Sequence, residues 1–177
     1  MISRKYAKDY TVSYEKTPRG QLKPTPVYVG PRFRLPLEGE ALGRIKLRFL
    51  LLTVLCGLCL LALLWFSWLF DGDHHYLVLP MALAVLPMAL TALGAWRLWT
   101  WPAELTREQR DRLANQLPAA CFFLALLGVL SLAAGVIQLF VGGLNWANGL
   151  YGLCALVFAV GSVLLFAGRK SLKPRPL

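Results

Sequence analysis

Ionisable side chains are missing from the four longest apolar stretches of the sequence, which cover residues 49–70, 77–96, 118–141 and 149–167. These stretches contain no Asp, Glu, Lys, Arg or His. Proton and ion pathways usually place such residues at membrane depth, and haem iron is held by ligands such as His. Their absence argues against a proton-coupled carrier, an ion pump and a cytochrome.

The polar parts of the chain lack the residue patterns of catalysis. They show no nucleophile paired with a base, no metal-ligand spacing and no glycine-rich loop for a phosphate. We therefore expect no catalytic residue, no resident metal and no cofactor. A non-enzymatic role is favoured over an enzymatic one.

The four cysteines also argue against redox chemistry, because Cys56, Cys59, Cys121 and Cys154 all lie in apolar stretches. They provide no disulfide framework. Cys56 and Cys59 form a C-x-x-C pair, as in some thiol oxidoreductases of membranes, but both lie near the middle of their stretch. A thiol at that depth stays protonated and packs as a small apolar group, so packing is the favoured role.

A short polar segment between the first two stretches contains Asp71, Asp73, His74 and His75. Two carboxylates and two imidazoles could bind a divalent cation. Contiguous residues rarely surround an ion, however, and Gly72 suits a tight reversal of the chain. A turn between two helices is the favoured interpretation.

The first apolar stretch, Phe49–Phe70, has 22 residues without a charge or a proline. A helix of this length is about 33 Å long, slightly more than the ~30 Å hydrocarbon core of a bilayer. Aromatic residues gather at its far end and basic residues precede it, as is typical of a membrane-spanning helix.

The other three stretches are also long enough to cross a bilayer. We therefore predict an all-α integral membrane protein built as an antiparallel bundle of four transmembrane helices, over residues 47–168. Residues 1–46 form a basic N-terminal tail and residues 169–177 a short C-terminal tail. In the connection 97–117, Thr106 and Gln109 predict a capped short helix. Pro118 is expected to open the third span.

Basic residues give the chain its orientation. The 19 Lys and Arg occur as 11 before residue 49, four between Arg97 and Arg112, and four after Ala167. By the positive-inside rule both termini and residues 97–117 are cytoplasmic, in a multi-pass protein of the plasma membrane. Anionic headgroups on the cytoplasmic side are the expected partners of these charges, and nucleic acid is not.

The N-terminal tail has a strand pattern. Tyr10, Val12 and Tyr14 alternate with polar residues, a turn follows, and a second short strand over Val27, Tyr28 and Val29 is preceded by two prolines. The pattern predicts a β-hairpin over residues 10–30. A lone hairpin is only marginally stable in water, so we expect support from the membrane, the bundle or another protein. The six named residues are the candidate partner-docking residues.

Small residues recur along one side of the last two spans. Such faces let transmembrane helices approach closely, so we predict a helix-packing face. Its members are Gly152, Ala155, Ala159, Ser162, Ser131 and Gly135.

These features favour a non-enzymatic accessory or regulatory subunit of the membrane. It would dock a larger membrane complex or a cytosolic protein through its N-terminal tail. The alternative is a small oligomeric carrier or channel for a neutral or lipid-like substrate.

Overall fold

The computed structural model describes residues 4–16, 22–36, 39–68, 75–102, 104–143, 145–172 and 174–176. Four long helices dominate it, and each is long and apolar enough to cross a membrane. The predicted all-α, four-span fold is confirmed. The helices are α1 (Gly39–Trp68), α2 (His75–Thr100), α4 (Leu117–Gly142) and α5 (Trp146–Gly168).

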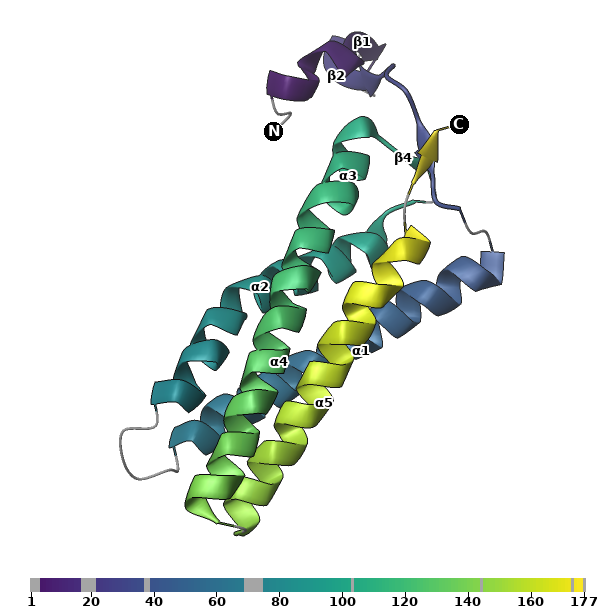
Figure 1. Cartoon of the computed structure of the whole chain (residues 1–177). Helices are drawn as coiled ribbons and strands as arrows, with labels where there is room; N and C mark the ends of the chain where they lie inside the picture. The colour runs from purple at the N-terminus through teal and green to yellow at the C-terminus, as the bar shows by residue number, and fades with distance from the viewer. Residues whose placement is uncertain are drawn as a thin grey trace.

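The four helices form an antiparallel bundle in which α1 and α4 each pack against both α2 and α5 (Figure 1). Its core is filled by fully buried side chains such as Leu63, Leu77 and Phe158. Large apolar side chains on the outward faces are exposed, for example Leu61 and Leu86. Such a surface suits hydrocarbon, because lipid tails are as apolar as leucine.

Pro118 lies in the first turn of α4, as the sequence predicts, but helical structure also continues upstream of it, from Arg107. The short helix α3 (Arg107–Asp111) has the predicted capping box of Thr106 and Gln109. It continues through a π-helical segment, η2 (Arg112–Gln116), into α4. Pro118 has no N–H, and its ring would clash with a carbonyl four residues earlier in an α-helix. The wider π turn just before Pro118 relieves that clash.

The predicted hairpin is present at one end of the bundle. Strand β1 (Tyr10–Lys16) pairs antiparallel with β2 (Leu22–Tyr28), after a 3-10 turn, η1 (Arg4–Asp9). A second small sheet joins three distant segments in the order β4-β3-β5. These strands are β3 (Phe33–Arg34), β4 (Glu104–Leu105) and β5 (Arg175–Pro176).

The second sheet brings both terminal regions and the α2–α3 connection to the same end of the bundle (Figure 1). We call this region the cap: the described parts of residues 4–36, residues 104–111 and residues 174–176. The cap contains most of the described polar contacts between distant parts of the chain.

Candidate functional site in the extramembrane cap

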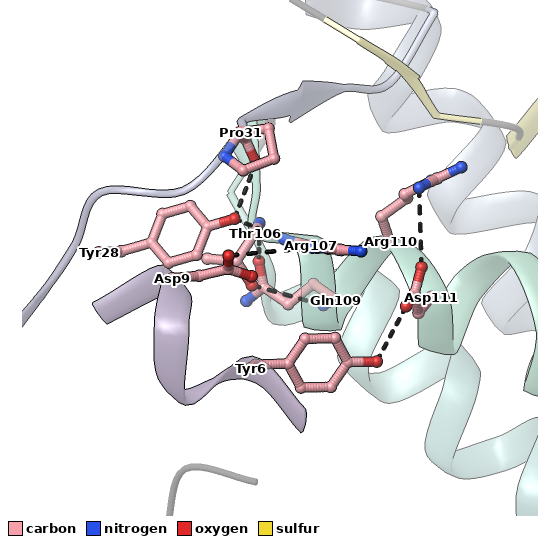
Figure 2. A network of polar contacts seen from close by, with 9 residues as sticks. All are labelled: Tyr6, Asp9, Tyr28, Pro31, Thr106, Arg107, Gln109, Arg110 and Asp111. Carbon is pink, nitrogen blue, oxygen red and sulfur yellow. Dashed lines mark hydrogen bonds and ion pairs between the residues drawn. The ribbon is translucent and has the colours of Figure 1, made fainter. Parts of the chain in front are cut away.

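The tail is attached to α3 through η1. The Tyr6 hydroxyl donates a hydrogen bond of 2.9 Å to Oδ2 of Asp111, and the Tyr6 side chain is buried (Figure 2). Asp9 Oδ1 lies 3.9 Å from Nη1 of Arg107. The first turn of the tail is therefore held by a bundle-connected helix, as the marginal stability of an isolated hairpin requires.

Tyr28 is a second attachment point. Its hydroxyl donates to the carbonyl oxygen of Pro31 at 2.8 Å and accepts from the backbone N–H of Arg107 at 3.0 Å (Figure 2). Tyr10 packs edge-on against the Tyr28 ring, with centroids 5.2 Å apart. Burial raises the pKa of the Tyr10 phenol, and the Glu108 carboxylate raises it further, so the ring stays neutral at physiological pH. One end of the hairpin is thus docked.

The second sheet closes the base of the cap. Phe33 of β3 and Leu105 of β4 are paired and buried, and the guanidinium of Arg110 lies 4.7 Å from the centre of the Phe33 ring. Arg32 and Glu104 form an ion pair of 2.9 Å. Both of these side chains are more than half exposed, so the pair contributes little.

The structure divides the six candidate docking residues into two groups. Tyr10 and Tyr28 face the cap, as described above. The other four side chains are exposed, by 57% for Val12, 67% for Tyr14, 42% for Val27 and 63% for Val29. Residues paired across the strands share a face, so Tyr10, Val12, Tyr14 and Tyr28 lie on one face and Val27 on the other. Val29 lies just beyond β2.

The strand register also shows which backbone groups of the hairpin are free. The N–H of Val29 donates to the carbonyl of Asp9 at 2.9 Å, so hydrogen-bonded pairs alternate from there: Thr11 with Val27, then Ser13 with Thr25. The N–H and C=O groups of Val12 and Tyr14 therefore point away from β2. Within the described residues no hydrogen bond satisfies them.

The outer edge of β2 is different. Its outward-pointing positions include Pro24 and Pro26, which lie opposite Tyr14 and Val12 and have no N–H. Prolines on an edge strand prevent further strand pairing. The hairpin therefore has one edge open to strand addition, that of β1, and one edge that is blocked.

The predicted small residues lie where α4 and α5 meet. Ser131, Gly135, Ala155, Ala159 and Ser162 are buried, and Gly152 is half-buried. The contact also contains Gly128, which the sequence reasoning missed. A Cβ at Gly128 would lie 2.5 Å from Oγ of Ser162 and 3.2 Å from Cα of Ala159. Its spacing of three and seven residues from Ser131 and Gly135 is the signal that could have identified it.

A polar network around two buried amides, Gln138 and Asn148, lies at the opposite end of the bundle. The Tyr76 hydroxyl donates to Oε1 of Gln138 at 2.5 Å, and Nε2 of Gln138 donates to Oδ1 of Asn148 at 3.4 Å. Nδ2 of Asn148 in turn donates to the carbonyl of Gly143 at 2.7 Å. The network joins α2, α4 and α5, and its amides are satisfied by the protein itself.

The remaining candidates add no chemical centre. The segment Asp71–His74 and the side chain of His75 lie outside the described residues. Within the part of the chain that is described, no group of three or more His, Cys, Asp or Glu could hold a metal. The four cysteines are free thiols, and Cys56 and Cys121 are buried in the bundle.

No family model matches the chain, and no curated protein or solved structure resembles it. Its function is therefore inferred from the geometry of its own residues.

Proposed function

We propose that the protein is a non-enzymatic accessory subunit of the membrane that recruits a protein partner through the open edge of β1. The proposal is carried by the N–H and C=O groups of Val12 and Tyr14, for which the described residues offer no partner, together with a β2 edge blocked by proline. An extended segment of a partner can add a strand there, with backbone hydrogen bonds giving affinity. The exposed side chains of Val12 and Tyr14 flank that edge and give specificity.

The charge of the tail indicates the kind of partner. Residues 1–36 contain eight Lys or Arg and two Asp or Glu. A segment with acidic flanks suits this surface, because complementary charge speeds encounter and excludes basic competitors. The docked end of the hairpin holds β1 in place before the partner arrives, which lowers the entropic cost of binding.

Replacing Val12 with proline tests the edge directly. Val12 points its N–H outward, so Val12→Pro removes an edge donor without removing a β1–β2 hydrogen bond. We expect partner recovery to fall at least about tenfold, since a donor is lost and the ring obstructs the added strand. The measurement is quantitative mass spectrometry of chains that co-purify with the full-length protein from host membranes.

Val12→Thr is the matched control, because it keeps the N–H and the β-branched shape. It should retain the partner. Amide exchange of Thr11 and Ser13 should stay slow in both variants, which shows that the hairpin is intact. Equal recovery with Val12→Pro and wild type would refute strand addition. Loss that occurs only on charge reversal of the tail would instead make the tail an electrostatic tether.

The proposed orientation of the chain in the membrane follows from the positive-inside rule. The cap and both termini would lie on the cytoplasmic side of the plasma membrane, near anionic headgroups. Single cysteines at Ser13 and at Trp146, both exposed, can be introduced into a chain whose native cysteines are replaced. An impermeant maleimide should label only position 146 in intact cells. Labelling of position 13 would reverse the orientation.

No observation favours the carrier or channel over the accessory subunit. Along the bundle axis the described side chains include fully buried Leu77, Met81 and Phe158. A substrate path between copies of the chain would need an oligomer, and flux through liposomes that contain this protein alone would support it.

A further inference from the structure

Two adjoining hollows lie on the outer surface where α2 meets η2 and α4. The first is a pocket of about 240 Å³ at the end of the bundle that carries the cap, and its lining includes Arg97, Trp101 and Arg112. The second is a groove of about 640 Å³ that extends along the helices past Pro87. Leu90 and Gln116 line both, so the two hollows are continuous.

The groove is apolar and opens on the outside of the bundle. Leu86 and Phe123 line it and are 68% and 53% exposed. Its volume is in the range of ~300–1,000 Å³ that is typical of sites for small ligands. Pro87, which lies inside α2, also lines the groove. Such a groove fits an acyl chain.

The pocket carries two arginines, Arg97 and Arg112, among mostly apolar lining residues. The Arg97 guanidinium forms no ion pair with any described residue. Arg112 lies beside it in the lining, held by Oε1 of Glu108 at 2.7 Å. Other arginines at this end are engaged differently: Arg110 stacks on Phe33 and Arg169 on Phe166. The uncompensated positive charge of Arg97 thus lies next to the end of the apolar groove.

The π-helical segment η2 places two residues in the pocket, Arg112 and Gln116. It spans Arg112–Gln116, and its first and last residues both line the pocket. Single π turns within α-helices are rare and are frequent at functional sites. Trp101 adds an indole to the lining, and indole rings favour the boundary between lipid headgroups and water.

We infer that this surface binds one anionic phospholipid. Its phosphate lies in the pocket against Arg97 and Arg112, and one acyl chain lies in the groove between α2 and α4. An arginine can donate two parallel hydrogen bonds to a phosphate, which explains why guanidinium groups line the polar end. The apolar length of the groove requires the lipid rather than a free phosphate.

The test is native mass spectrometry of the delipidated full-length chain, titrated with dioleoyl phosphatidylglycerol or dioleoyl phosphatidylcholine. We expect one phosphatidylglycerol to bind tightly and phosphatidylcholine to bind more weakly. Arg97→Gln should weaken phosphatidylglycerol binding about tenfold or more, because a charge-assisted hydrogen bond is lost. Arg97→Lys keeps the charge but not the paired donors, so its affinity for phosphatidylglycerol should lie between those of wild type and Arg97→Gln.

Two matched controls separate the site from general effects. Arg48→Gln removes an exposed charge from α1 at the same end and should bind as wild type does. Ala119→Trp fills the groove and should weaken binding, whereas Ala133→Trp, exposed elsewhere on α4, should not. Thermal melting of each variant in detergent verifies folding.

Three results would overturn the proposal. The first is unchanged affinity in Arg97→Gln, or an equal loss in Arg48→Gln. The second is unchanged affinity in Ala119→Trp. The third is displacement of the lipid by glycerol phosphate at equal concentration, which would show that the acyl chain contributes nothing.

Discussion

The two ends of the bundle are closed in different ways. At the far end, three helices are joined by an uncharged network, in which the amides of Gln138 and Asn148 are buried and Tyr76 is partly exposed. At the cap end, three distant segments meet in a small sheet, and several charged side chains remain partly exposed. The far end completes the bundle, whereas the cap end carries the outer backbone groups of β1 and the Arg97 guanidinium, neither of which has a partner among the described residues.

The difference has an energetic basis. The bundle depends on close helix packing through small residues, so a larger side chain at one of these positions lowers the stability of the fold. The cap combines a small buried cluster, which includes Phe33 and Leu105, with a few polar contacts that are individually worth about 0.5–1.5 kcal/mol. Regions with few buried contacts open locally at low free-energy cost. We therefore expect changes in the cap to leave the bundle folded.

The largest expected effect comes from Ala159→Leu in α5. The backbone of Ala159 lies against Gly128 of α4, so added bulk must push the helices apart. We expect a loss of about 1–3 kcal/mol in the free energy of unfolding. Thermal unfolding in detergent measures it, with Ala167→Leu, at an exposed position near the end of α5, as the control. Equal melting temperatures for the two variants would show that this face does not hold the bundle together.

Asn148→Ala is expected to have the next largest effect. It removes the bond to the Gly143 carbonyl and leaves the buried amide of Gln138 without its acceptor. An unsatisfied buried polar group costs about 1–3 kcal/mol. The melting temperature in detergent should be clearly lower than that of the control Asn115→Ala, a change at an exposed position. If both variants melt as wild type does, the far-end network is dispensable.

Thr106→Ala should act within the cap alone. It removes the side-chain acceptor of the capping box, for a local loss of about 1 kcal/mol. Hydrogen exchange should become faster in Arg107–Asp111 while the amides of α5 are unaffected. Thr100→Ala, whose hydroxyl bonds only within its own helix, is the control. Faster exchange throughout the bundle would contradict the separation between cap and bundle.

The smallest expected effect is that of Arg32→Gln. The Arg32–Glu104 pair is exposed at both partners, and such pairs contribute about 0–1 kcal/mol. The melting temperature should hardly change, and any change should vanish at high salt. A large, salt-independent loss would mean that this pair is an essential part of the cap.

Much of the architecture could be predicted because it is encoded locally. Long uncharged stretches are sufficient to define membrane-spanning helices, and Thr106 with Gln109 encodes the start of α3. The alternation around Val12 and the prolines of β2 encode the hairpin and its blocked edge. The docking role of the hairpin stays a prediction, since no relative informs it. The same is true of the proposed orientation.

Other features depend on contacts that no local pattern contains. Phe33, Glu104 and Arg175 belong to strands that meet only because the folded bundle brings their helices to one end. Gly128 gains its importance from Ala159 on a different helix, and Arg97 gains a neighbour in Arg112 through the π turn.

Four membrane-spanning helices, a capped connection and a hairpin follow from local patterns, because hydropathy, periodicity and capping act over neighbouring residues. The folded structure was needed to show which end of the hairpin is docked, through Tyr6 and Tyr28, and which edge remains open. The folded structure also shows that Arg97, which forms no ion pair with a described residue, lies where the pocket meets the apolar groove. Such features arise from packing between distant segments, which depends on shape and distance in the folded chain rather than on the order of residues.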